Sequence, residues 1–172
     1  MAIVHREVQR LNVLIGDLLD YANPRPRQSV DFDLGALVEE TLHVARGDQA
    51  FAAVEVHADV DKPLRIHADP SKLRQVVWNL LRNAAQAGGK QVRITARDDA
   101  GGATITVADD GAGIPPERIA NIFDPFFTTK SKGTGLGLAT CHAVIAEHGG
   151  RIDVESTVGK GTKMVVRLPR ES

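Results

Sequence analysis

Three side-chain amides recur at four-residue intervals near the middle of the sequence. Gln75, Asn79 and Asn83 would share one face of a helix, because residues four apart lie one above the other. Amide oxygens are hard, neutral ligands that suit Mg²⁺ when phosphate oxygens complete its coordination. The same spacing is also that of a polar stripe facing solvent. From these residues alone, a metal–phosphate site and a solvated helix face both remain open.

Two carboxylates open a glycine-containing segment at residues 109–114, Asp-Asp-Gly-Ala-Gly-Ile, directly after a predicted strand. Gly111 and Gly113 let the backbone approach a ligand closely. An ionised carboxylate only accepts hydrogen bonds. Asp109 could therefore receive the exocyclic amine of adenine, whereas the carbonyl oxygen that guanine presents at that position would be repelled. The alternative is an ordinary turn at the end of a strand.

Phenylalanines are concentrated in residues 123–130, Phe-Asp-Pro-Phe-Phe-Thr-Thr-Lys, which hold three of the five in the chain. We expect Phe126 and Phe127 to anchor the foot of a mobile loop over residues 124–134, because the rest of that segment is polar, small or glycine-containing. Lys130 and Lys132 would then reach for phosphates. The alternative is a turn in the core with two solvated lysines.

Residues 133–138, Gly-Thr-Gly-Leu-Gly-Leu, lead directly into a predicted helix. Glycine-lined backbone amides and the positive end of a helix favour a bound anion, so this segment is a candidate phosphate site. A Gly-x-Gly-x-Gly run is weak evidence when it stands alone. A dinucleotide-binding fingerprint would follow a strand near the start of a βαβ unit, and a Walker A loop, GxxxxGK[ST], is absent.

Hydrophobic periodicity predicts the elements that must hold these segments in place. Helical spacing extends over about residues 33–46, 69–88 and 136–147, with Asp33 and Asp69 as N-caps, and a short helix fits residues 116–122. Alternation predicts strands near residues 54–58, 64–68, 92–96, 103–108, 151–156 and 162–168. The expected fold is an α/β two-layer sandwich, with a mixed sheet of about five strands and about three helices.

The first 22 residues carry a different pattern. Apolar residues with a 4-3-4-3-4 spacing predict one long helix of a coiled coil or bundle: Val4, Val8, Leu11, Ile15, Leu18 and Ala22. Pro24 and Pro26 then end that helix. We therefore divide the chain into a helical segment at 1–23, a linker at 24–29 and a globular domain at 30–172.

The composition narrows the possible functions. With 172 residues, of which 42% are hydrophobic and 25% charged, the chain can bury the core of one domain. A net charge of −1 provides no global attraction to nucleic acid or to a membrane surface. The single cysteine excludes an intrachain disulfide, and no apolar run reaches the ~18 residues of a membrane helix. We expect a cytoplasmic domain, which is compatible with a membrane anchor elsewhere in a longer parent protein.

Taken together and in this order, the four segments resemble the N, G1, F and G2 boxes of sensor histidine kinases. Those kinases belong to the superfamily that includes the gyrase, heat-shock and mismatch-repair ATPases. The resemblance extends over about residues 30–168 and is most similar to the nitrogen-regulation type. It implies a Bergerat-type fold with these ATP-binding residues: Asn79, Asn83, Asp109, Gly111, Gly113, Ile114, Phe127, Lys130, Gly133, Thr134, Gly135, Leu136, Gly137 and Leu138.

This resemblance also implies an activity and its partners. The catalytic domain of such a two-component kinase passes the γ-phosphoryl group of ATP to a histidine, with Asn83 and Asn79 holding Mg²⁺ and Asp109 holding adenine. Residues 1–23 resemble the second helix of a dimerisation and phosphoacceptor hairpin. The implied partners are that acceptor domain of the parent kinase, a response-regulator receiver domain, and a second copy of the chain through the N-terminal helix.

The acceptor histidine itself is not expected in this chain. The family's motif is similar to His-Glu-x-x-Asn-Pro and has no counterpart here, because His5 is followed by Arg6 and lies on the wrong helix. We therefore expect the acceptor upstream in the intact kinase and no autophosphorylation of this chain.

Two other functions remain open, an ATP hydrolase of the same superfamily and a nucleotide-binding module without turnover. In the superfamily's hydrolases a glutamate near position 75 is the water-activating base. Gln75, placed near the γ-phosphate, cannot take up a proton at neutral pH. Gln75 thus favours histidine transfer or simple binding over hydrolysis, and no residue is assigned as a catalytic acid or base.

Overall fold

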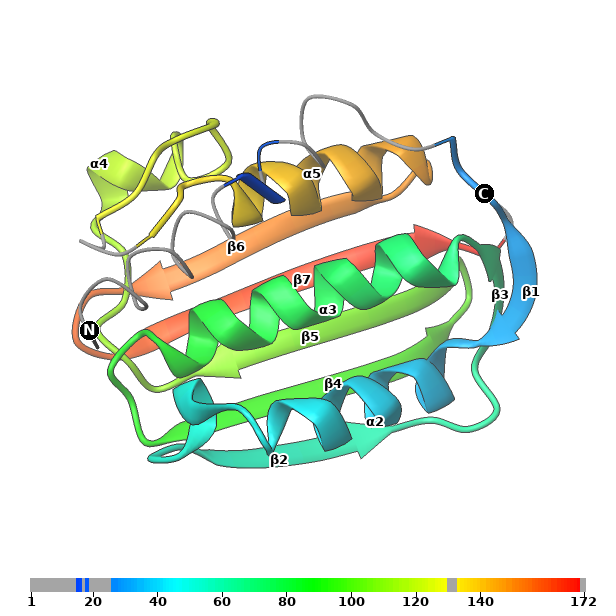
Figure 1. Ribbon diagram of the computed structural model, residues 1–172, viewed down its shortest axis with the longest axis horizontal. Helices are drawn as coiled ribbons and strands as arrows, with labels where there is room; N and C mark the ends of the chain where they lie inside the picture. Colours follow the sequence, from blue (N-terminus) through cyan, green and yellow to red (C-terminus); the bar gives the residue numbers. More distant parts are fainter. Residues whose placement is uncertain (1–14, 17, 19–25, 130–132, 171–172) are drawn as a thin grey trace.

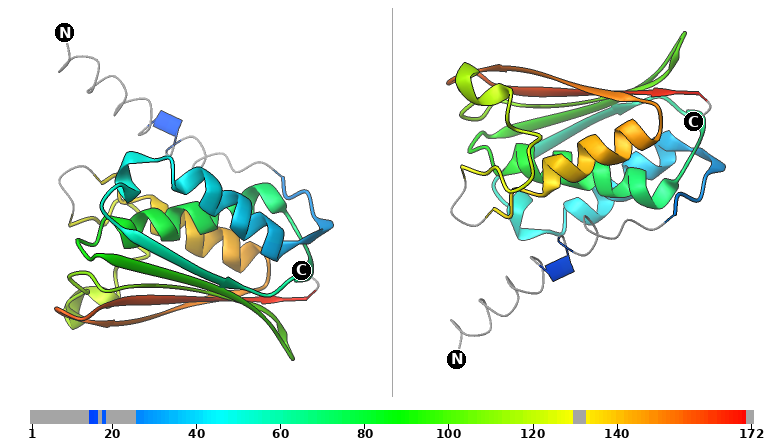
Figure 2. Two further views of the ribbon diagram at one scale, coloured as in Figure 1. Left: turned by 90° about the horizontal axis from the view of Figure 1, so that it is seen from below. Right: turned by 90° about the horizontal axis from the view of Figure 1, so that it is seen from above.

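A mixed five-stranded sheet with helices packed on one of its faces forms the body of the domain (Figure 1 and Figure 2). The computed structural model describes residues 15–16, 18, 26–129 and 133–170. The strand order is β2-β4-β5-β7-β6, for β2 (Glu55–Val60), β4 (Gln91–Asp99), β5 (Gly102–Asp109), β7 (Gly161–Pro169) and β6 (Arg151–Thr157). Only the β2–β4 pair is parallel within this sheet. The expected two-layer α/β sandwich is confirmed.

Three helices form the second layer: α2 (Leu34–Ala45), α3 (Pro70–Ala85) and α5 (Gly137–Glu147). Figure 2 shows them side by side on one face of the sheet, with α3 between its two neighbours. Asp69 caps α3 by accepting the N–H groups of Ser71 and Lys72, and Pro70 occupies the first turn, as the sequence predicts. The face of α3 toward the sheet is apolar and buried, and includes Leu73, Val76, Val77, Leu80 and Leu81. This packing fixes the direction in which the amides of α3 point.

A separate two-stranded sheet is made by β1 (Val30–Asp33) and β3 (Arg65–Ala68). The strand predicted at residues 64–68 therefore exists but does not join the main sheet, and β1 was not predicted. Alternation of apolar residues indicates an extended backbone but does not specify which strand it pairs with. The strand β1 has only four residues, two of them aspartates, so it is too short to be recognised from its pattern. The short helix predicted at 116–122 is confirmed only as α4 (Pro116–Ile119), because the backbone turns after Ala120. A one-turn 3₁₀ helix, Gln49–Phe51, was also not predicted.

Some predictions lie outside the described residues. This applies to Lys130 and Lys132, and to the helix expected over residues 1–22, apart from Ile15, Gly16 and Leu18. The division into 1–23, 24–29 and 30–172 stays a prediction. Within the described ranges, no helix is both long and apolar enough to cross a lipid bilayer.

Candidate functional site

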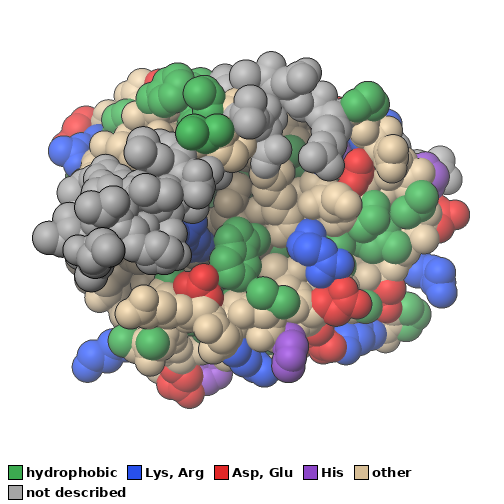
Figure 3. Space-filling view, in the orientation of Figure 1, with side chains coloured by type: hydrophobic (Ala, Val, Ile, Leu, Met, Phe, Trp, Pro, Cys, Tyr) green, Lys and Arg blue, Asp and Glu red, His purple; other side chains and the backbone are tan. Residues whose placement is uncertain are grey.

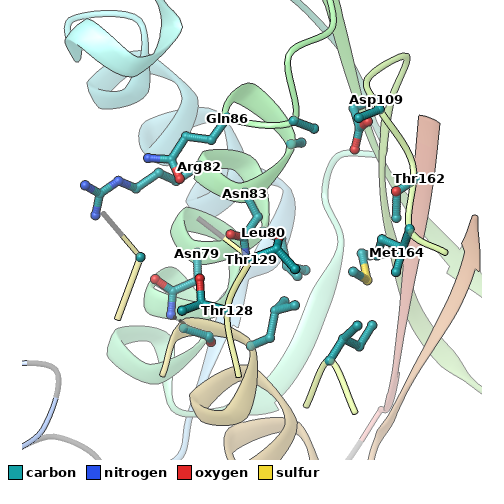
Figure 4. Close-up of a pocket in the computed structure, with 18 of the residues that line it drawn as sticks. Asn79, Leu80, Arg82, Asn83, Gln86, Asp109, Thr128, Thr129, Thr162 and Met164 are labelled. Atoms are coloured by element: carbon teal, nitrogen blue, oxygen red, sulfur yellow. Dashed lines mark hydrogen bonds between the residues drawn. The ribbon is translucent and has the colours of Figure 1, made fainter. Parts of the chain in front are cut away.

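A cavity of about 600 Å³ opens between α3, the loop before α5, and the ends of β5 and β7 (Figure 4). Figure 4 shows Asn79 and Asn83 on α3, with Asp109, Thr162 and Met164 on the opposite wall. Every one of the four sequence segments contributes to the lining. The predicted site residues found there are Asn79, Asn83, Asp109, Gly113, Ile114, Phe127, Gly133, Thr134, Gly135, Gly137 and Leu138.

The wall formed by α3 carries two half-buried asparagines one helical turn apart. The Nδ2 atom of Asn79 donates to the carbonyl of Gly137 at 3.3 Å, which links α3 to the first residue of α5. Because the nitrogen end of this amide is directed at Gly137, its oxygen is the end available to a cation. Gln75 lies one turn earlier on α3, is also half-buried, and is not among the residues that line the cavity.

The two adjacent carboxylates have different surroundings. Asp109 is half-buried, lines the cavity, and accepts the N–H of Gly111 at 2.9 Å. Asp110 is exposed and accepts the N–H groups of Lys90 and Gln91, both at 2.8 Å. These donors, Gln91 first, hold the pKa of Asp110 below its ordinary value. Asp110 therefore fastens the loop to the start of β4, whereas Asp109 faces the cavity.

The glycines after these carboxylates are required by the protein's own backbone. Gly113 has φ +71°, and a Cβ there would lie 2.2 Å from the carbonyl oxygen of Thr157. A Cβ at Gly111 would lie 2.5 Å from the carbonyl oxygen of Ala87, just after α3. Gly111 was expected at the nucleotide but is not a lining residue, because it packs under the end of α3 instead.

The start of α5 provides polar backbone groups to the cavity. The helix begins at Gly137, and no side chain caps it from Leu136. The first N–H groups of a helix have no carbonyl partner within it, so they are available to an anion. Leu136 was expected at the nucleotide, but it is 1% exposed and packs in the interior. Its N–H donates to the hydroxyl of Thr134 at 3.2 Å, which orders the turn before the helix.

Phe126 and Gly135 meet at the base of the loop that precedes α5. The N–H of Phe126 donates to the carbonyl of Gly135 at 3.0 Å. Gly135 has φ +72°, and a Cβ there would lie 2.4 Å from the carbonyl carbon of Phe126. Phe126 itself has φ +66° although it is not glycine, and its ring is 62% exposed. Phe127, in contrast, is half-buried and lines the cavity, so only one of these two aromatic rings anchors the loop to the core.

Several lining residues were missed by the sequence analysis. They are Leu80, Arg82, Ala84, Gln86, Ala87, Val107, Ala112, Pro115, Arg118, Ile122, Thr128, Thr129, Val158, Thr162 and Met164. Those on α3 follow from helical spacing around the asparagines. Thr162 and Met164 could have been found only from strand pairing, because β7 brings Thr162 directly opposite Asp109. Over the described part of the face in Figure 3, acidic and basic side chains are interspersed without a large patch of one sign.

The chain matches a known family over this region. Residues 68–172 fit the family described as histidine kinase-, DNA gyrase B-, and HSP90-like ATPase, which is more than half of the 172 residues. The chain belongs to this family. The resemblance inferred from the four motifs is therefore confirmed, and ATP binding is the property that the family shares.

Within this ATPase family, the chain is most clearly similar to sensor histidine kinases. The chain is 36% identical over 170 residues to the sensor histidine kinase ZraS of Escherichia coli O157:H7, covering 97% of this chain and 37% of ZraS. The catalytic domain of the histidine kinase ThkA matches with a TM-score of 0.76 and 32% identity, over 84% of this chain and 97% of that domain. A structure of ThkA in complex with the response regulator TrrA matches with a TM-score of 0.82 and 30% identity, over 98% of this chain and 49% of ThkA. The chain thus spans well under half the length of the curated relatives it matches.

Proposed function

We propose that this chain is the ATP-binding catalytic domain of a sensor histidine kinase, and that it transfers the γ-phosphoryl group of ATP to a histidine of a separate acceptor domain. The observation that carries the proposal is the convergence of all four motif segments on one cavity of about 600 Å³. Membership of the ATPase family supports the nucleotide, and the likeness to ZraS and ThkA supports the kinase.

Each wall of the cavity has a role in holding the nucleotide. Asp109, an acceptor, would take the exocyclic amine of adenine, while Val107 and Met164 provide apolar surface for the ring. The glycine-rich turn and the start of α5 would take the phosphates through backbone N–H groups. Lys130, which lies outside the described residues, is proposed to add a positive charge there.

The residues present also fit a magnesium ion. Among the described residues, no group of three or more His, Cys, Asp or Glu side chains could hold a metal. We propose that a cation rests on the side-chain oxygens of Asn83 and Asn79, which line the cavity, together with phosphate oxygens of the nucleotide. This is a ligand set that suits Mg²⁺, which is commonly held by few protein groups and substrate phosphates. When bound, the ion neutralises charge on the phosphates.

The transfer that we propose depends on positioning and charge stabilisation. The bond between the γ-phosphorus and its bridging oxygen breaks, ADP leaves with the electron pair, and a P–N bond forms with an imidazole nitrogen. The proton on the other ring nitrogen, the one that did not attack, is then released to solvent. A neutral imidazole nitrogen is already a nucleophile, so the chain needs no general base, in keeping with glutamine rather than glutamate at position 75.

The partners follow from this assignment. We propose that residues 1–23 belong to the dimerisation hairpin, 24–29 to a linker and 30–172 to the catalytic domain, and that a response-regulator receiver domain receives the phosphoryl group. Ile15 and Leu18, two members of the predicted apolar seam, are 54% and 45% exposed, which is consistent with a partner helix. The ThkA–TrrA complex shows that a protein of similar structure meets a response regulator.

The test is transfer to a second protein. The chain should bind ATP and leave itself unlabelled by γ-³²P-ATP, but slowly label the histidine of a two-helix acceptor domain from its parent kinase, because the tether and its effective concentration are lost. The label should be acid-labile, as a phosphoramidate is. The Asp109→Asn variant is the matched control for dependence on the nucleotide site.

Other outcomes of this experiment have distinct meanings. Acid-labile label on the chain alone would overturn the missing-acceptor prediction. ATP binding without any transfer would favour the binding module. Rapid release of free phosphate in the absence of an acceptor would favour the hydrolase.

A further inference from the structure

Three polar side chains form one row across three neighbouring strands at the edge of the cavity. Thr162 on β7 is paired with Asp109 on β5 and with Ser156 on β6. Residues in register on adjacent strands point to the same face, so all three side chains lie on the helix side of the sheet. Asp109 and Thr162 line the cavity, whereas Ser156 lies behind Thr162 and does not. Ser156 was not among the predicted site residues.

The hydroxyl of Ser156 makes three short polar contacts. The N–H of Ile114 lies 2.8 Å from Ser156 Oγ, the carbonyl oxygen of Gly161 lies 3.0 Å from it, and the hydroxyl of Thr162 lies 2.9 Å from it. A serine hydroxyl has one proton to donate and two lone pairs that accept. A carbonyl oxygen has no proton, so the contact with Gly161 is a hydrogen bond only if Ser156 donates.

The number of available protons then gives the direction of the hydrogen bond between Ser156 and Thr162. Because Ser156 donates its only hydroxyl proton to the carbonyl of Gly161, its oxygen accepts hydrogen bonds from both Ile114 and Thr162. The hydroxyl proton of Thr162 therefore points at Ser156 and away from the cavity. Thr162 is 8% exposed and lines the cavity, so with its proton on Ser156 its hydroxyl can act toward the cavity only as an acceptor.

We propose that Ser156 is a specificity-determining positioning residue, which holds Thr162 as a hydrogen-bond acceptor toward the purine. The inference rests on the proposed function, because it assumes that adenine occupies the Asp109 wall. Asp109 and Thr162 would then both accept hydrogen bonds from the substituent at the 6-position of the purine. An amine, as in adenine, satisfies such an edge, whereas the oxygen of a 6-oxo purine meets only acceptors.

Selectivity between two nucleotides tests this role. The dissociation constants of ATP and of inosine triphosphate, which has an oxygen at the 6-position, are measured for the full chain and its variants. In Ser156→Ala the Thr162 hydroxyl is released and can rotate to donate into the cavity. The preference for ATP, expressed as the ratio of the two dissociation constants, should then fall by about tenfold. The reason is that the Thr162 hydroxyl can now donate a hydrogen bond to the 6-oxygen of inosine triphosphate instead of only accepting one.

Three further variants separate this role from simple loop support. Ser156→Thr keeps the hydroxyl and should keep the wild-type ratio. Thr162→Val removes the hydroxyl altogether and should lower the ratio, with no further fall when it is combined with Ser156→Ala. Thr157→Ala, at the next and exposed position of β6, is the matched control and should leave the ratio unchanged.

A purely structural role makes a different prediction. If Ser156 only links Ile114 to the turn at Gly161, Ser156→Ala weakens the binding of ATP and of inosine triphosphate by the same factor. The ratio of the two dissociation constants then stays constant. That result, or an unchanged ratio in Thr162→Val, would overturn the inference. A wild-type chain that binds neither nucleotide would instead contradict the proposed function itself, so the two failures are distinguishable.

Discussion

The two ends of α3 use polar residues in opposite ways. At its start, the carboxylate of Asp69 accepts the N–H groups of Gln28, Ser71 and Lys72 at 2.8, 3.0 and 3.2 Å. The N–H of Asp69 donates to Nε2 of His148, a side chain with no exposed surface, at 3.1 Å. Burial alone would raise the pKa of Asp69, but these backbone donors, Gln28 first, outweigh it and lower the pKa. Each of these polar groups is satisfied inside the protein.

The other end of α3 faces the cavity. Asn79 and Asn83 line it from the helix, and Asp109 lines it from the opposite wall (Figure 4). The contrast shows that residue type does not distinguish a stabilising polar group from one at the cavity, because one aspartate, Asp69, caps α3 and another, Asp109 on β5, lines the cavity. What differs is that Asp69 accepts three backbone N–H groups away from the cavity, whereas Asp109, which accepts the N–H of Gly111, also lines the open cavity. Substitutions at the start of α3 should therefore change stability, and those at the cavity should change affinity.

The largest effect is expected at Asp109. Asp109→Asn keeps the shape of the side chain but turns one acceptor into a donor, which would face the amine of adenine in the proposed binding mode. Losing a charge-assisted contact should cost about 2–3 kcal/mol, or roughly 30–150-fold in ATP affinity. Titration with a labelled ATP measures this. Asp110→Asn is the matched control and should leave the affinity unchanged, and equal effects of the two variants would remove the distinction between these carboxylates.

The next effect is expected at the closed end of α3. Asp69→Ala removes the cap of the helix and leaves the N–H of Gln28 without its acceptor, so the free energy of unfolding should fall by about 2 kcal/mol. Urea denaturation measures the loss. ATP affinity under native conditions should be unchanged. A loss of affinity without a loss of stability would contradict the division between the two ends.

A smaller and conditional effect is expected at Asn83. Asn83→Ala removes one of the two side-chain oxygens proposed to hold Mg²⁺, so ATP affinity should fall on the order of tenfold with Mg²⁺ and by less without it. Isothermal titration in magnesium and in EDTA makes the comparison. Arg74→Ala, on the same helix but exposed and outside the cavity lining, is the control. Equal losses with and without the metal would mean that Asn83 is only structural.

The smallest effect concerns pH and the cap of α2. The N–H of Leu64, followed by those of Ala36 and Gly35, holds the pKa of Asp33 below its ordinary value. A carboxyl whose folded pKa is lowered stabilises the fold above its unfolded pKa of ~3.9, and this contribution is lost as pH falls through the folded pKa. The difference in unfolding free energy between wild type and Asp33→Asn should therefore shrink between pH 6 and pH 3. A constant difference in urea melts would contradict this assignment.

Local signals in the sequence were sufficient for much of the fold. Asp33 and Asp69 were identified as caps because a cap bonds to N–H groups two and three residues away. The three long helices and the strands of the main sheet followed from periodicity. The strand at 64–68 was assigned no partner, since β1 lies more than thirty residues upstream and has too few residues to carry a pattern.

The candidate site divides in the same way. The order of the four motifs, with their amides, carboxylate and glycines, is a property of the sequence, and this order is sufficient to identify the family. Only the tertiary structure decided that Asp109 faces the cavity while Asp110 bonds to Lys90 and Gln91, or that Leu136 turns into the core.

The row of Asp109, Thr162 and Ser156 was likewise settled by strand pairing. The physical reason is the range of the interactions. Capping, helical spacing and turn formation depend on residues within a few positions of one another, so they can be recognised from the sequence. Strand register and the direction of a hydroxyl proton depend on atoms contributed by segments dozens of residues apart, which meet only when the chain has folded.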